Sequence, residues 1–302
     1  MKQDAIAYSP ATTDSSSHTK LGDLIALAKP RLNTLVVATT AGGYYMAGPA
    51  ELDMTRLALT CLGTALVASG ASAANQVYER DTDRLMARTR TRPMADGRMR
   101  VAEALVFAAV MTVAGLSLIW AVATPEAVWV AAATVVSYVA IYTPLKRRTS
   151  FSTVVGAVPG ALPPLIGWAA VRGSVSGIEP WSLFFIMFLW QLPHFLAIAW
   201  MYREDYSRAG LPMLSVLDPN GAVSGRQAVL WAASLVPFGL LPYLLDMTTG
   251  VYAVGSLILG LGQLALAAAF ARHRSTANAR TLFFASIVYL PLLWILMVLA
   301  RT

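Results

Sequence analysis

The sequence predicts an all-α integral membrane protein with about nine transmembrane helices arranged around a central cavity. Three observations lead to this fold class. Of the 302 residues, 57% are hydrophobic and only 13% are charged, whereas soluble domains carry about 25% charged residues. Apolar stretches long enough to cross a bilayer recur along the chain, separated by short charged or Pro/Gly-rich breaks. Basic residues are concentrated on one side of these stretches, as in multi-pass membrane proteins.

A helix needs about 20 apolar residues to cross the hydrocarbon core. Stretches of this kind predict helices at 32–49, 57–77, 101–122, 126–143, 152–171, 181–200, 227–245, 250–270 and 281–300. The fifth contains "GAVPGALPPLIGW" (156–168), and such irregular backbone is tolerated at membrane depth where it lines a cavity. We therefore expect room for a bulky ligand there, with a merely kinked helix as the alternative. Residues 1–20 are polar and contain no signal-peptide core, which predicts a disordered tail followed by a single domain at 21–302.

The distribution of charge predicts the orientation. With the N-terminus inside, 20 of the 23 Lys and Arg residues lie in cytoplasmic segments, and such a bias fixes topology. We expect a bacterial inner-membrane protein with a cytoplasmic N-terminus and a periplasmic C-terminus. The net charge of +7 is then explained by topology, and no nucleic-acid partner is needed.

A dense charged segment, "NQVYERDTDRLMARTRTRP" (75–93), follows the second helix at its cytoplasmic end. Asn75, Glu79 and Asp83 are spaced four residues apart, so they share one face of a continuing helix. Two carboxylates and an amide oxygen suit Mg²⁺, which often bridges substrate phosphates. Asp81 lies on the opposite face, where it can pair with a neighbouring Arg. The alternative is a juxtamembrane loop whose acids merely offset its arginines.

Several basic side chains near these acids suit a metal-bound polyphosphate, because a guanidinium group matches phosphate oxygens in shape and charge. They are Arg84, Arg88, Arg90 and Arg92. A second cytoplasmic segment, "YTPLK", offers the Tyr142 hydroxyl and the Lys146 ammonium group, and its Pro144 is expected to end the fourth helix. Tyr142 and Lys146 also fit a simpler interpretation, an aromatic belt residue followed by a topogenic lysine.

A third segment, "WQLPHFLAIAWMYREDYSRAG", combines His194 within the sixth helix with Arg203, Glu204 and Asp205 at its cytoplasmic end. An ionisable residue at membrane depth is a functional candidate, and histidine can bind iron or shuttle protons. A hydrogen bond to a neighbouring helix is the alternative for His194. Glu204 and Asp205 form a second carboxylate pair. We take His18 and His273 to be solvated.

The three segments together resemble the signatures of the UbiA-type intramembrane prenyltransferases, and in their longer form the heme O synthases within that superfamily. The similarity covers about residues 20–300. Two departures from the broader superfamily are informative. The region after the sixth helix has few acids, which fits the heme subfamily, and Glu79 stands where many members have Asp, a change that should preserve metal binding.

The resemblance implies transfer of farnesyl from farnesyl diphosphate to a vinyl group of heme b, giving heme O for terminal oxidases. It implies Mg²⁺ at Asn75, Glu79, Asp83, Glu204 and Asp205. It also implies ligand contacts by Arg88, Arg92, Tyr142, Lys146, His194 and Arg203. Heme A synthase or a terminal oxidase assembly would be the protein partner. The alternatives are a phenolic acceptor, a transporter or channel, and a heme-binding chaperone. The charged residues of the three segments cluster at the cytoplasmic face of the membrane. A transporter would be expected to place its binding residues at the middle of the bilayer, so this distribution argues against transport.

Overall fold

A computed structural model describes residues 19–48 and 51–302, and these residues are predominantly helical with no β-strand. The predicted disordered tail therefore lies mostly outside the described residues, as does His18. The helices are α1 (Lys20–Ala28), α2 (Pro30–Met46), α3 (Met54–Arg84), α4 (Pro93–Asp96), α5 (Val101–Val122), α6 (Pro125–Val135), the π-helix η1 (Val136–Tyr142), α7 (Thr143–Leu145), α8 (Ser152–Ala161), α9 (Pro163–Arg172), α10 (Ile178–Met201), α11 (Arg203–Arg208), α12 (Leu214–Leu217), α13 (Ala222–Gly239), α14 (Leu241–Leu244), α15 (Gly250–His273) and α16 (Thr276–Leu299).

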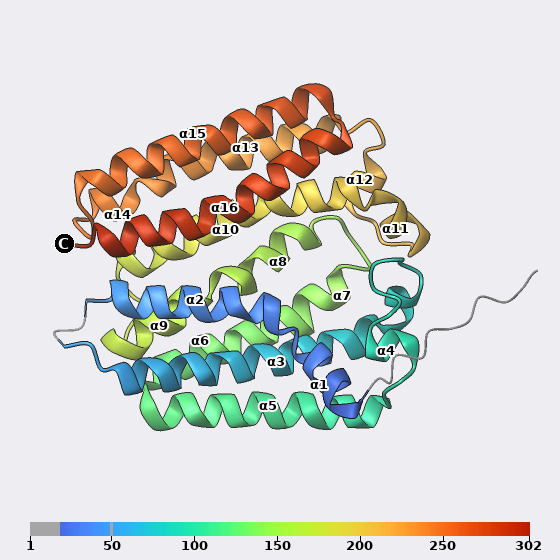
Figure 1. The fold of residues 1–302 in the computed structure, drawn as a ribbon, viewed down its shortest axis with the longest axis horizontal. Helices are drawn as coiled ribbons and strands as arrows, with labels where there is room; N and C mark the ends of the chain where they lie inside the picture. The colour runs from blue at the N-terminus through green and yellow to red at the C-terminus, as the bar shows by residue number, and fades with distance from the viewer. Residues whose placement is uncertain (1–18, 49–50) are drawn as a thin grey trace, which may run out of the picture.

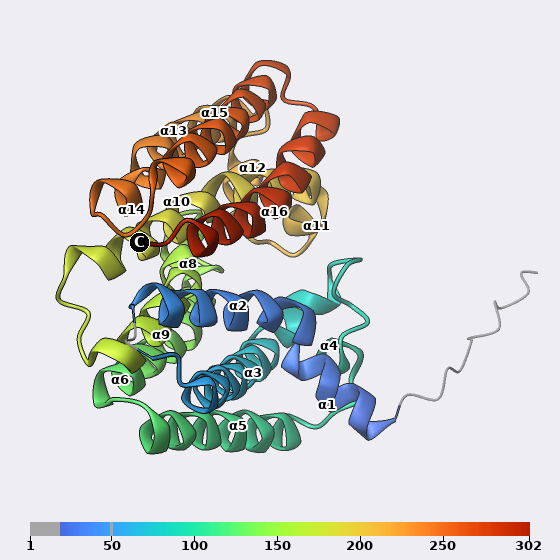
Figure 2. The ribbon, with the colours of Figure 1, turned by 60° about the vertical axis from the view of Figure 1, so that its left-hand side comes forward.

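The long helices lie side by side along one axis, and the short helices α1, α4, α7, α11 and α12 gather at one end (Figure 1). The C-terminus lies at the opposite end. Turning the molecule shows α13 and α15 on one outer side and α5 on the other (Figure 2). Figures 1 and 2 both place α2, α8, α10 and α16 between these outer helices.

Eight helical segments within the described residues are long and apolar enough to cross a membrane. In the 18-residue apolar stretch of the segment that contains α10, 72% of the residues are buried inside the protein, whereas in that of the segment that contains α6 only 11% are. α10 is therefore the central helix, and α6 faces the surroundings. Each of the nine predicted ranges overlaps a helix, and the one that is not among these eight segments, 32–49, corresponds to α2, which has 17 residues. The all-helical membrane fold is confirmed, while nine spans and the orientation stay predictions.

Small residues let α3 approach α5 closely. A β-carbon on Gly115 of α5 would lie 2.6 Å from the Gly63 carbonyl oxygen, and one on Gly70 would lie 2.7 Å from the Ala108 carbonyl oxygen. Such small-residue contacts allow helices to pack in a membrane, where dispersion rather than water exclusion drives association. α3 continues to Arg84, seven residues beyond the predicted apolar range, as the spacing of Asn75, Glu79 and Asp83 requires.

The prediction that Pro144 ends the fourth helix is confirmed to within one residue. Pro144 lies at the start of the short helix α7, and helical structure continues to Leu145. The preceding turn widens into the π-helix η1, in which the Thr143 hydroxyl donates to the Tyr138 carbonyl at 2.8 Å. A proline needs no amide hydrogen at a helix start, so the widened turn accommodates the ring. The predicted irregularity of the fifth helix is confirmed, because α8 and α9 are separated at Leu162.

Candidate functional site

A cavity of about 370 Å³ lies between α2, α3, η1, α8 and α10. Six predicted site residues line it: Asn75, Glu79, Arg88, Tyr142, Lys146 and His194. The charged members come from the end of the molecule that carries the short helices, and the remainder of the lining is mostly apolar. The cavity thus joins a polar mouth to an apolar interior.

The inward face of α3 supplies the polar mouth. Glu79 accepts a hydrogen bond from Lys146 Nζ at 3.0 Å, and both side chains are largely buried. Asn75 is 2% exposed; its Nδ2 donates to Thr143 Oγ1 at 3.1 Å, and its Oδ1 accepts from Lys29 Nζ at 3.4 Å. The four-residue spacing therefore presents the amide and the carboxylate to one cavity, as the sequence predicted.

Asp83 continues the same face of α3 but stands one turn behind the cavity lining. Its Oδ2 accepts from Arg92 NH1 at 2.8 Å, while its buried Oδ1 has no hydrogen-bond partner. A buried carboxylate oxygen without a hydrogen-bond partner is the kind of hard ligand that Mg²⁺ prefers. Within residues 19–48 and 51–302, however, no three His, Cys, Asp or Glu side chains lie close enough to hold a metal by themselves. The amide of Asn75 or a ligand oxygen is therefore needed.

The predicted arginines divide into two groups. Arg88 lines the cavity, where its NH2 donates to the Tyr206 hydroxyl at 3.3 Å and its guanidinium group lies 4.9 Å from the Tyr202 ring centroid. Arg84 instead donates to the Ala95 carbonyl at 2.6 Å and fastens the loop after α3. Arg90 is exposed and does not line the cavity.

The predicted pairing of Asp81 is confirmed, because its Oδ1 accepts from Arg80 at 3.0 Å.

The second carboxylate pair does not join the first. Glu204 is exposed, and Asp205 on α11 pairs with Arg208 and accepts from the backbone amides of Ala87 and Arg88. Burial acts to raise the pKa of Asp205, but these donors outweigh it and lower that pKa. Asp205 thus holds the loop that carries Arg88. Arg203 lies 4.7 Å from the Trp200 ring centroid and does not line the cavity.

Aromatic rings and glycines shape the apolar part of the cavity. Tyr138 and Tyr142 stack with their ring centroids 5.5 Å apart. A β-carbon on Gly156 would lie 2.7 Å from Cδ2 of Tyr142, so only glycine allows this ring position. His194 lies deeper along α10, and its Nδ1 is 2.7 Å from Ser286 Oγ. The Pro/Gly-rich segment therefore lines the cavity, as expected.

Lys29 is a cavity residue that the motifs did not reveal. It has a left-handed backbone (φ 48°) between α1 and α2 and points its amine at Asn75. Burial, together with the nearby Arg92 guanidinium group, lowers the pKa of Lys29 to about 7. An anion in the mouth would favour the protonated amine. Its only sequence signal is a lysine before Pro30 at the start of an apolar run.

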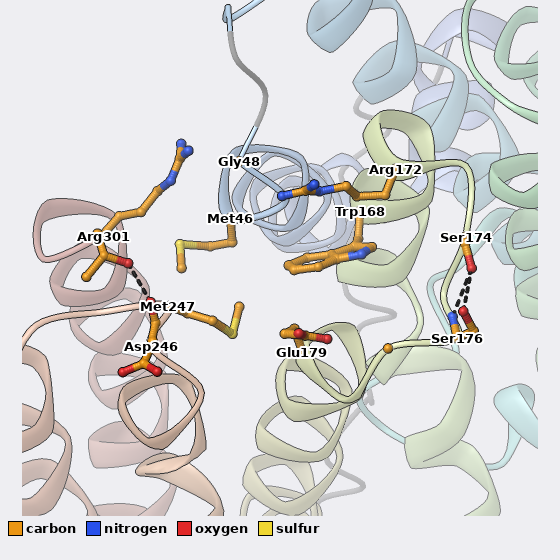
Figure 3. Close-up of a pocket in the computed structure, with 12 residues that line it drawn as sticks. Met46, Gly48, Trp168, Arg172, Ser174, Ser176, Glu179, Asp246, Met247 and Arg301 are labelled. Atoms are coloured by element: carbon orange, nitrogen blue, oxygen red, sulfur yellow. Dashed lines mark hydrogen bonds between the residues drawn. The ribbon is translucent and has the colours of Figure 1, made fainter.

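A second cavity, of about 490 Å³, opens at the opposite end of the molecule (Figure 3). Arg172, Glu179, Asp246 and Arg301 surround it, with Trp168 in its wall. None of the predicted site residues lines it. The 370 Å³ cavity is therefore the candidate site even though it is smaller.

The fold and the cavity together define an intramembrane protein whose site is built for an anionic head and an apolar body. Comparison with known proteins gives the family. The model of the UbiA prenyltransferase family matches residues 35–288. The chain therefore belongs to the UbiA prenyltransferase family.

Similar proteins carry a more specific name. The chain is 44% identical to protoheme IX farnesyltransferase of Solibacter usitatus, with 92% of this chain and 98% of that protein covered. It is 43% identical to protoheme IX farnesyltransferase of Opitutus terrae, with coverages of 93% and 95%. The resemblance to the heme O synthases is thereby confirmed.

Solved structures share the fold. A structure of digeranylgeranylglyceryl phosphate synthase has a TM-score of 0.76 at 17% identity and covers 93% of this chain and 98% of its own. A UbiA homolog from Archaeoglobus fulgidus bound to DMAPP and Mg²⁺ has a TM-score of 0.69 at 15% identity, with coverages of 91% and 99%.

Proposed function

We propose that this protein transfers the farnesyl group of farnesyl diphosphate to a vinyl group of heme b, with addition of water, giving heme O and diphosphate. The observation that carries the proposal is one cavity with Glu79, Lys146 and Arg88 at its mouth and aromatic side chains around His194 inside. The names of the similar proteins supply the two substrates. The site of action is the bacterial inner membrane, with the mouth on the cytoplasmic side.

The mouth binds the diphosphate. Carboxylates alone would repel it, because two like charges about 4 Å apart cost roughly 4 kcal/mol at an effective dielectric of about 20. Asn75, Glu79 and Asp83 would hold a divalent cation, which would supply positive charge beside the leaving diphosphate. Lys29, Lys146 and Arg88 add positive charge at the same place, and so stabilise the diphosphate as it departs.

The apolar part binds the farnesyl chain and the macrocycle. Burying fifteen carbons at about 0.8 kcal/mol each is worth on the order of 10 kcal/mol. Two of the lining residues, Leu32 and Leu35 of α2, are 65% and 37% exposed. We therefore place the opening of the cavity on the α2 side, where a long apolar ligand can extend toward the lipid.

The reaction forms one carbon–carbon bond. The allylic C–O bond of farnesyl diphosphate breaks, and both of its electrons leave with the diphosphate. The vinyl π electrons of heme b attack the allylic cation, and water captures the cation that results while a proton is released. The stacked Tyr138 and Tyr142 rings line the cavity, and aromatic faces stabilise a cation by about 0.5–2 kcal/mol. His194 is the proposed ligand of the heme iron.

Product analysis tests the function. Purified protein in detergent is incubated with heme b, farnesyl diphosphate and Mg²⁺, with and without EDTA, and the hemes are separated by mass. We expect a Mg²⁺-dependent heme that is heavier by a farnesyl group and a hydroxyl group. The Glu79→Gln variant should lose this product, whereas Asp81→Asn, on the opposite face of α3, should retain it.

Two other results would change the assignment. Prenylation of a hydroxybenzoate with no heme product would point to a phenolic acceptor. If folded protein binds heme in the presence of Mg²⁺ but transfers no farnesyl group, the protein is a heme-binding protein without catalytic activity.

A further inference from the structure

The ring of His194 is held on three sides. It stacks on Trp190 with centroids 5.3 Å apart and on Phe283 of α16 with centroids 4.9 Å apart. Its Nδ1 lies 2.7 Å from the hydroxyl oxygen of Ser286, which is fully buried on α16. The Trp190 indole N–H donates to the Ser286 carbonyl at 2.8 Å. Two helices thus fix one imidazole at the cavity wall.

The hydrogen bonds of Ser286 determine which nitrogen of His194 carries the proton. The Ser286 hydroxyl donates its single hydrogen to the Phe283 carbonyl at 2.6 Å. It therefore has only lone pairs left for His194, so Nδ1 must be the donor in their contact. The neutral imidazole then has its lone pair on Nε2. No hydrogen bond engages Nε2 within the described part of the chain, and the ring lines the cavity.

A histidine whose Nδ1–H is bound to a fixed acceptor is the arrangement that metal-ligating histidines adopt. A free metal ion would need further protein ligands, and no group of three suitable side chains exists in the described residues. A heme iron differs, because its macrocycle already supplies four nitrogens and a single histidine suffices. The aromatic ring of Trp190, which also lines the cavity, suits a flat apolar macrocycle as well.

We propose that Ser286 is a positioning residue that locks His194 with its Nδ1 protonated, so that Nε2 faces the cavity as the axial ligand of the substrate heme. This inference rests on the proposed function, since it takes heme as the ligand of this cavity. Ser286 acts through His194 and does not touch the reacting atoms. It places the iron at the interior end of the cavity that carries Glu79 and Lys146 at its mouth.

Heme titration and resonance Raman spectroscopy of the whole protein in detergent test the inference. Ferrous heme b bound to the wild type should show an iron–histidine stretch, and His194→Ala should lose it. Ser286→Ala should shift this band to lower frequency and weaken heme binding about tenfold or more, as loss of such a partner does. Ser286→Thr, which keeps the hydroxyl, should restore both.

Ser256→Ala is the matched control. Ser256 is a buried serine on α15 whose hydroxyl donates to the Gly239 carbonyl at 2.9 Å, so the change removes an interhelical hydrogen bond away from His194. Its Raman band should be that of the wild type. The inference is wrong if Ser286→Ala keeps the wild-type band and affinity, or if wild-type heme has no histidine ligand. Failure of farnesyl transfer in the wild type, with the band intact, would refute the proposed function alone.

Discussion

Replacing Lys146 by Met removes one partner of the ion pair in the cavity mouth. Lys146 Nζ and Glu79 Oε1 are 3.0 Å apart, and the two side chains are only 14% and 6% exposed. At this distance the attraction is about 5 kcal/mol for an effective dielectric of about 20. Desolvation offsets much of that gain, but breaking a buried pair leaves an uncompensated charge and costs about 3–5 kcal/mol. We therefore expect the free energy of unfolding to fall by about 3 kcal/mol.

A double-mutant cycle separates stability from activity. Glu79→Gln alone should destabilise the protein similarly, because it leaves the Lys146 charge unpaired. The double variant carries neither charge, so it should regain most of the lost stability while it remains inactive in heme farnesylation. Unfolding by SDS in mixed micelles, followed by circular dichroism, measures the stability of each variant. Formation of the farnesylated heme measures its activity.

Arg80→Met provides the control for this cycle. The Arg80–Asp81 pair has the same 3.0 Å separation on the same helix but is solvent-exposed, so its loss should leave the unfolding midpoint unchanged. A double variant no more stable than Lys146→Met would refute the reasoning, because the two charges would then not stabilise each other.

Three further outcomes are expected. Gly70→Val should lower the free energy of unfolding by about 1–3 kcal/mol, because overpacking forces α3 from α5; Gly262→Val, where a β-carbon meets nothing within 4 Å, should leave it unchanged. EDTA should abolish product formation and excess Mg²⁺ restore it, and Asp83→Asn should raise the Mg²⁺ concentration for half-maximal rate, because one ligand oxygen loses its charge. The pKa of Asp205 is lowered in the folded protein, so its ionised carboxylate stabilises the loop at 85–92 at any pH above the ordinary aspartate pKa of about 4. This contribution to stability is lost as the pH falls through the lowered pKa. The protection factors of amide hydrogens in that loop should therefore fall in acid in the wild type, and should be low throughout this pH range in Asp205→Asn.

Local patterns predicted most of the fold. Hydropathy alone located the long helices, because a bilayer requires long apolar segments. It missed α1, a nine-residue helix with Leu21 and Ile25 largely exposed, because so short a helix depends on contacts with distant segments. One such contact is the Arg98–Asp23 ion pair at 3.1 Å.

The candidate site was predictable only where its geometry is local. Asn75 and Glu79 are one helical turn apart, so their shared face follows from spacing. The contact of Lys29 with Asn75 joins residues 46 apart in sequence, and that of Ser286 with His194 joins residues 92 apart. Residue spacing cannot predict contacts between residues so far apart in the sequence. Asp205 was placed among the metal ligands by motif, whereas its tertiary contacts make it a support for the loop after α3.

The proposed opening of the cavity beside Leu32 and Leu35 has a kinetic consequence for the proposed reaction. A substrate that enters from the bilayer is encountered by diffusion in two dimensions, so the enzyme responds to the mole fraction of substrate in the membrane rather than to its concentration in the whole solution. Adding detergent or lipid at a fixed amount of farnesyl diphosphate and heme then dilutes both substrates at the surface where they react. An apparent KM measured in micelles is therefore a property of the mixture, and it is comparable between variants only at a constant ratio of substrate to amphiphile.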